Sequence, residues 1–84
     1  PGPDPLAWYA LKAKPKREHF AARQLADRTQ LEVFAPRVSI LRSRAGTGAT
    51  GVLEALFPGY LFCRFRHNLD LRFVLSTPDV TGVV

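Results

Sequence analysis

The side chains that could catalyse a reaction are few and lie far apart in this sequence. Its two histidines, His19 and His67, have no Cys, Asp or Glu at the spacing of a metal site or a catalytic triad, and we expect both to be solvated. Cys63 is the only cysteine, so neither a disulfide within the chain nor a cysteine-rich zinc site can form. The sequence therefore predicts no catalytic residue, no metal site and no cofactor, and indicates that the protein is not an enzyme.

One glycine-rich stretch has the spacing of a phosphate-binding loop. Residues 46–51 match Gly-x-Gly-x-x-Gly, but a dinucleotide site needs that string between a buried strand and a helix. Here Phe57-Pro58-Gly59 follows it, which is typical of a turn. We interpret residues 42–51 as a flexible hairpin connection without regular structure.

Length and charge narrow the class of protein. Eighty-four residues with 46% hydrophobic side chains make one small folded domain, and a formal net charge of +5 favours a polyanionic partner such as nucleic acid. A basic surface that serves only solubility is the alternative. Without a membrane-spanning run or a signal peptide, we expect a cytoplasmic protein. The chain has no methionine and stops at Val84 inside an apolar run, so we expect a part of a longer protein.

The periodicity of apolar residues predicts six elements after a disordered segment over residues 1–5. We expect strands over residues 6–13, 31–41, 59–65 and 80–84, and helices over residues 16–28 and 69–75. This order predicts an α+β fold of the ferredoxin-like or RRM-like βαββαβ type. In that fold the first and third strands are central in an antiparallel four-stranded sheet with both helices on one face.

Three residues define the expected boundaries of these elements. Pro15 suits the first position of the first helix, and Asn68 suits the cap of the second. Pro36 restricts the second strand to an edge or a bulge, because proline cannot donate to a sheet ladder.

The third strand is apolar on both faces, although a sheet covered on one side needs only one apolar face. If Leu61, Cys63 and Phe65 pack under the helices, Tyr60 and Phe62 point outward. Phe57, Trp8 and Ala10 would lie beside them. Such a patch indicates a partner surface, unless the remainder of a longer protein covers it.

A single-strand nucleic-acid module is one alternative. Residues 59–65 approach the aromatic RNA-binding strand of an RRM, which has the same topology. However, Pro58 stands where that motif has a basic residue, and Leu61 stands where it has Gly or Ala.

Several segments together resemble the N-terminal (NGN) domain of the NusG family, over residues 6–84. They are Trp8-Tyr9-Ala10-Leu11, Lys14-Pro15, Val33-Phe34-Ala35-Pro36, Glu54-Ala55-Leu56-Phe57-Pro58-Gly59-Tyr60-Leu61-Phe62 and Ser76-Thr77-Pro78-Asp79-Val80-Thr81-Gly82-Val83. The segment from Glu54 to Phe62 looks closer to the specialised RfaH-like paralogues than to housekeeping members.

The resemblance implies a transcription elongation and antitermination factor that acts with transcribing RNA polymerase at the nucleoid. Its outward patch would dock on the clamp helices of the largest polymerase subunit. The residues carried over to this contact are Trp8, Ala10, Lys12, Phe57, Tyr60 and Phe62.

The resemblance also implies contacts with nucleic acid and with a second domain. Lys14, Arg17, Gln24 and Arg28 would contact the non-template DNA strand, and Arg42 and Arg44 would contact upstream DNA, unless the basic helix face is merely solvated. The family commonly has a C-terminal KOW domain, which is absent from these 84 residues. In RfaH-like members such a domain masks the patch, and Glu54 matches an acidic residue of that closed state.

Overall fold

The computed structural model describes residues 3–44 and 48–84, which form two helices and six strands. The helices are α1 (Glu18–Thr29) and α2 (His67–Leu75). The strands are β1 (Leu6–Ala13), β2 (Glu32–Phe34), β3 (Arg37–Arg44), β4 (Gly48–Ala55), β5 (Tyr60–Arg66) and β6 (Val80–Val83).

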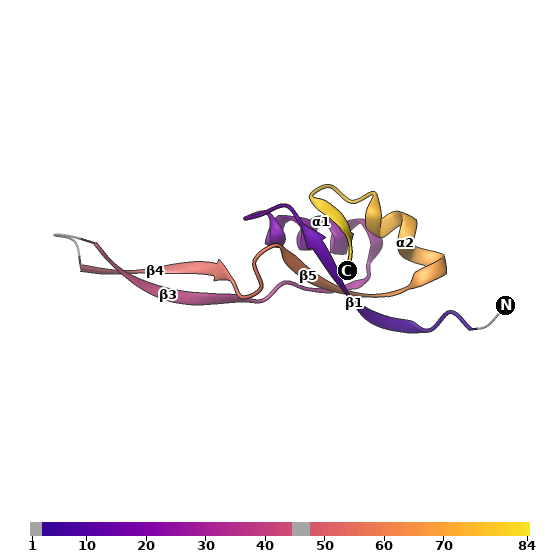
Figure 1. Cartoon of the computed structure of the whole chain (residues 1–84), viewed down its shortest axis with the longest axis horizontal. Coiled ribbons are helices and arrows are strands. Elements are labelled where there is room, and N and C mark those ends of the chain that lie inside the picture. The colour runs from indigo at the N-terminus through magenta and orange to yellow at the C-terminus, as the bar shows by residue number, and fades with distance from the viewer. Residues whose placement is uncertain (1–2, 45–47) are drawn as a thin grey trace.

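Four strands form one antiparallel sheet in the order β2-β5-β1-β6. Both helices lie on the same side of this sheet, above it in Figure 1. The predicted fold class is confirmed, including the central position of the first strand and of the strand at residues 60–66. Neither helix covers the opposite side of the sheet, which is therefore its open side.

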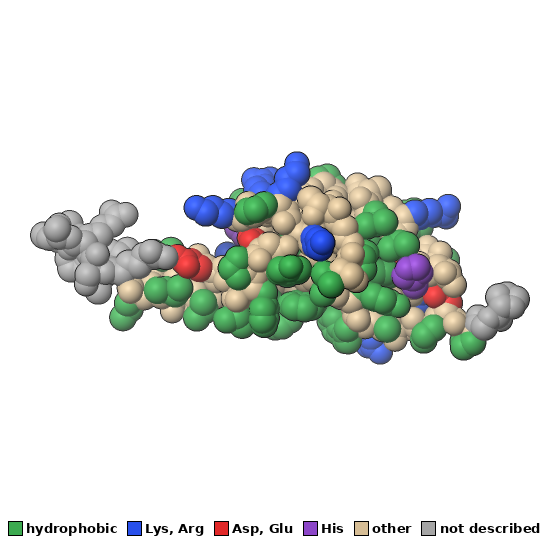
Figure 2. Space-filling model, in the orientation of Figure 1, with side chains coloured by type: hydrophobic (Ala, Val, Ile, Leu, Met, Phe, Trp, Pro, Cys, Tyr) green, Lys and Arg blue, Asp and Glu red, His purple; other side chains and the backbone are tan. Residues whose placement is uncertain are grey.

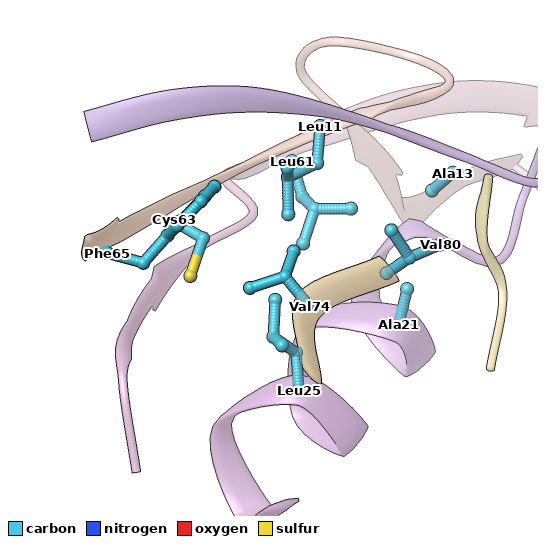
Figure 3. Packing of buried hydrophobic residues seen from close by; sticks show 9 residues of the cluster. All are labelled: Leu11, Ala13, Ala21, Leu25, Leu61, Cys63, Phe65, Val74 and Val80. Atoms are coloured by element: carbon cyan, nitrogen blue, oxygen red, sulfur yellow. The ribbon is translucent and has the colours of Figure 1, made fainter. Parts of the chain in front are cut away.

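The core fills the space between the sheet and the helices. Phe65, Leu61 and Cys63 of β5 are fully buried beside Leu11 of β1, and they face Leu25 of α1 (Figure 3). Ala21, Val74, Val80 and Ala13 complete the cluster. Each large apolar side chain that is fully buried contributes roughly 1.5–3 kcal/mol, so β5 supplies much of the driving force for folding.

The prediction for residues 31–51 is wrong in two respects. The predicted single strand breaks at Pro36, whose carbonyl accepts a hydrogen bond from the Leu56 amide at 2.9 Å. The predicted flexible connection is instead a long ribbon, in which β3 and β4 pair from Arg37 opposite Ala55 to Arg44 opposite Gly48. Residues 45–47, which include part of the Gly-x-Gly-x-x-Gly string, lie outside the described residues.

The ribbon projects from the body, as Figure 1 shows, and gives the molecule a long axis of 63 Å against 20 and 19 Å for the others. Pairing between β-branched residues such as Ile40 and Val52 stabilises it, because cross-strand side chains of this kind pack well. The glycines and small polar residues at 42–51 had indicated a connection without regular structure, but they do not prevent strand pairing here.

The first helix starts later than predicted. Pro15 lies in a turn, in which the Arg17 amide donates to the Lys14 carbonyl at 3.0 Å. Lys16 has a left-handed φ of 63°, which a helix cannot include. Helix α1 therefore begins at Glu18, whose carboxylate accepts from the Lys16 amide.

The second helix is capped from a distant part of the chain. Asn68 is not the cap; the carboxylate of Asp4 accepts hydrogen bonds from the amides of Asn68 and Leu69 at 3.0 and 3.1 Å. A carboxylate suits this place because helix N-termini favour negative charge. Residues 1 and 2 lie outside the described part of the chain, and a disordered segment over residues 1–5 stays a prediction.

Within residues 3–44 and 48–84, no helix is long and apolar enough to cross a membrane.

Candidate functional site: the open face of the sheet

The open face is organised in three rows of side chains that run across the strands. Because paired residues share a side of the sheet, the register defines each row. One row contains Glu32, Arg64 and Trp8, the next contains Phe34, Phe62 and Ala10, and the third contains Tyr60, Lys12 and Gly82. The rows alternate with the buried residues of β5, so they point away from the helices.

Four aromatic side chains gather on this face and are called the aromatic patch below: Trp8, Phe34, Phe57 and Phe62. They surround a shallow hollow of about 320 Å³. The rings of Phe57 and Phe62 meet edge to face, with their centroids 5.4 Å apart. Trp8 is 52% exposed and Phe34 is 56% exposed, so large apolar groups here face solvent.

Figure 2 shows how hydrophobic and charged side chains are distributed on one face of the molecule. Hydrophobic side chains gather along the underside of the sheet, whereas many of the lysines and arginines lie on the upper side with the helices. An apolar centre with the charged residues at its margins is the usual composition of a protein interface.

The structure brings together most of the residues predicted for a partner surface. Trp8, Phe57 and Phe62 form the patch, and Ala10 and Lys12 lie beside it in the rows. Tyr60 borders the patch and also lines a larger groove of about 730 Å³ between the start of α1 and the base of the ribbon. Whether these residues bind a partner stays a prediction.

Phe34 and Arg64 lie on this face but were not among the residues predicted for it. Phe34 pairs with Phe62, and Arg64 pairs with Trp8. The alternation along Glu32, Val33 and Phe34 indicates that Phe34 and Val33 lie on opposite faces of the sheet. It does not show which of the two faces is open, because only the pairing of β2 with β5 decides that.

A tight turn holds Phe57 and Tyr60 in place. The Tyr60 amide donates to the Phe57 carbonyl at 3.0 Å, and Gly59 has a φ of 82°, as the third position of a type II turn requires. Pro58 occupies the second position, where its fixed φ is favourable. The Gly59 carbonyl also accepts from the Ala13 amide at 2.8 Å, which joins the turn to β1.

Glu18 ties this turn to the first helix. Its buried carboxylate accepts hydrogen bonds from the amides of Gly59 and Lys16 through the same oxygen, at 2.9 and 3.2 Å. Burial raises the pKa of the Glu18 carboxyl, but the amides of Gly59, Glu18 and Lys16, together with the nearby His19, favour its ionised form. Their combined effect is larger, so its pKa lies below the ordinary value. The carboxylate is thus a positioning group behind the patch.

The face has charged residues at both ends of the patch. The Arg64 guanidinium donates to the Glu32 carboxylate at 3.2 Å, and both side chains remain substantially exposed, at 40% and 64%. Lys12 lies two rows away, and its ammonium group makes no hydrogen bond or ion pair with the residues that the structure describes.

The residues predicted to contact DNA differ in their surroundings. Arg17 makes two hydrogen bonds to one oxygen of Asp79, at 3.0 and 3.1 Å. Arg28 donates to the main-chain carbonyl and the hydroxyl of Ser76. Lys14 is exposed and Gln24 is half-buried. Arg42 and Arg44 lie on β3, but their side chains lie outside the described part of the structure.

The histidines are in two different settings. His19 is half-buried, and its ring packs against that of Phe20 at a tilt of 37°, with 4.1 Å between the centroids. His67 is exposed at the start of α2. The Arg17 guanidinium lies over the Phe20 ring, 4.4 Å from its centre. This cation–π contact explains why an aromatic side chain lies on a basic face of the helix. Over the described residues, no group of three or more His, Cys, Asp or Glu side chains could hold a metal ion.

A comparison with known proteins identifies a family for most of the chain. Residues 6–84 match the family described as "Transcription termination factor nusG". No individual curated protein matches the chain with significance.

Proposed function

Since this chain belongs to the NusG family of transcription termination and elongation factors, we propose that its aromatic patch docks on the clamp helices of the largest RNA polymerase subunit. The family consists of non-enzymatic transcription factors that associate with RNA polymerase. For this chain, the aromatic patch would be the binding surface and the clamp helices would be the part of the polymerase that it contacts. The protein would act with transcribing polymerase at the nucleoid.

The aromatic patch is the observation that carries this proposal. Trp8, Phe34, Phe57 and Phe62 line one hollow on the open face, and none of them belongs to the buried core. A shallow apolar hollow suits the ridge of side chains on a helix, and a few aromatic anchors commonly supply most of the affinity of an interface.

We also propose a secondary contact between the α1 side and the non-template DNA strand. Lys14 is exposed beside the start of α1, and Gln24 lies on that helix. Contacts of this kind are directed mainly to phosphates, so DNA binding would weaken steeply with salt. Arg17 and Arg28 would first have to leave Asp79 and Ser76.

The narrower proposal of an RfaH-like antitermination factor is supported by residues 54–62 of the sequence. It predicts that the full-length protein suppresses pausing only where a specific DNA element recruits it. A transcription assay on templates with and without candidate elements separates this activity from that of a general factor.

The alternative is a free single-strand nucleic-acid module of the RRM type, in which the same aromatic residues would stack on bases. The family match favours polymerase binding. Binding of a bare oligonucleotide at micromolar affinity or better, lost on removal of Phe62, would favour the alternative.

A matched pair of aromatic substitutions tests the polymerase proposal. Phe57 and Phe73 are each 45% exposed, but Phe57 belongs to the patch whereas Phe73 lies on α2 beneath Arg72. We expect Phe57→Ala to weaken binding to the cognate core RNA polymerase at least about thirtyfold, as loss of a central anchor does. Phe73→Ala should bind like the parent chain.

Two controls make the result specific. Circular dichroism should show both variants folded, and a polymerase that lacks the clamp helices should bind none of the three chains. Equal binding by Phe57→Ala and Phe73→Ala would contradict the proposal.

A further inference from the structure

We propose that Lys12 and Arg64 form a pair of cationic contacts that select a partner helix with acidic residues at both ends of its apolar stripe. This inference rests on the proposed docking of the aromatic patch. It names a charge pattern in the partner, and it assigns a binding role to Arg64.

The register places these two cations at opposite ends of the patch. Lys12 is opposite Tyr60, and Arg64 is four residues further along β5, opposite Trp8. The row of Phe34, Phe62 and Ala10 lies between them. At about 3.4 Å per residue and about 4.8 Å between strands, the two side chains start about 14 Å apart.

Both cations are available to a partner. Lys12 is exposed and has no ion pair among the described residues. Arg64 shares a single hydrogen bond with an exposed carboxylate, that of Glu32. Exposed pairs of this kind are weak, so a better placed carboxylate on a partner can replace Glu32 as the acceptor.

The geometry limits the partner. Residues seven or eight positions apart lie on one face of a helix. At a rise of about 1.5 Å per residue, they are separated by about 10.5–12 Å along the helix axis, slightly less than the roughly 14 Å between the two cations. Long lysine and arginine side chains can cover the remaining distance. Between the two acids, the helix must present apolar side chains to the hollow formed by Trp8, Phe34, Phe57 and Phe62.

Charge reversal on the intact chain tests this pattern against core RNA polymerase without DNA. We expect Lys12→Glu and Arg64→Glu each to weaken binding about fivefold, because each loses an attraction and gains a repulsion. Arg23→Glu changes the net charge equally from an exposed position on α1, and should bind like the parent. Replacement of clamp-helix carboxylates by lysine, one at a time, should restore the binding of one reversal variant and not of the other.

The outcomes separate this inference from the proposal beneath it. If all three charge reversals behave alike while Phe57→Ala still weakens binding at least about thirtyfold, the patch docks without the charge pattern and the inference is wrong. If Phe57→Ala binds normally, the docking proposal fails and the inference fails with it.

Discussion

The two sides of β5 have similar side chains and opposite surroundings. Leu61, Cys63 and Phe65 are fully buried against the helices, whereas Tyr60 and Phe62 alternate with them on the open side. On the covered side, apolar groups stabilise the fold. On the open side, they remain in contact with water, which is unfavourable for an isolated domain and which the proposed partner surface would explain.

This difference separates stability from binding within a single strand. A substitution on the covered side should act on the free energy of unfolding. A substitution on the open side should act on the affinity for a partner.

The largest expected effect is on the covered side. Phe65 has no exposed surface and packs on Tyr9 with ring centroids 4.5 Å apart. Phe65→Ala should lower the free energy of unfolding by about 3–5 kcal/mol, since it removes a large buried ring and leaves a cavity.

The same substitution on the open side is the control. Phe62→Ala should cost about 1 kcal/mol of stability, because its ring is only partly buried. Urea titrations of both variants measure the difference. Similar losses at the two positions would mean that the open side is part of the core.

An intermediate effect is expected at Glu18, which links the covered side to the turn beneath the patch. Because its pKa is lower in the folded state, its contribution to stability is complete above about pH 4.5 and is lost as the pH falls through the folded pKa. Glu18→Gln should remove that part of the pH dependence and cost about 1–3 kcal/mol at pH 7.

Unfolding measured at several pH values between 7 and 3 checks this expectation. The parent chain and Glu18→Gln should converge as the pH falls. Parallel curves would show that the carboxylate does not titrate with folding.

The smallest effect is expected at the ion pair on the helix side. Asp79 is nearly buried but Arg17 is half exposed, at 11% and 49%, so solvent screens the pair. Asp79→Asn tolerates the left-handed φ of 69° and should cost about 1 kcal/mol or less. The same variant frees Arg17, so stronger binding to single-stranded DNA would show that the ion pair competes with nucleic acid.

The sequence predicted those parts of the molecule that depend on local periodicity. The alternation along residues 59–65 separated the buried Leu61, Cys63 and Phe65 from the outward Tyr60 and Phe62 before any contact was known. The order of elements then predicted the topology, because few arrangements of βαββαβ are possible in one sheet.

The features that were missed depend on contacts between distant residues. The cap of α2 comes from Asp4, 64 positions before Asn68, and no pattern near the helix indicates it. Glu18 is buried because Gly59, 41 positions away, donates to its carboxylate. In the ribbon, the pairing of β3 with β4 outweighs the low strand preference of its glycines, which had indicated an irregular connection.

The most direct test of the central claim is an amide chemical-shift titration of this chain with the isolated clamp-helix hairpin of the cognate RNA polymerase. We expect the largest shifts on the open side, at Trp8, Phe34 and Phe62, and at the turn that holds Phe57. Residues of α1 and α2 that face away from the sheet should shift little. Shifts concentrated on the helices, with the patch unchanged, would contradict the assignment of the open face as the polymerase-binding surface.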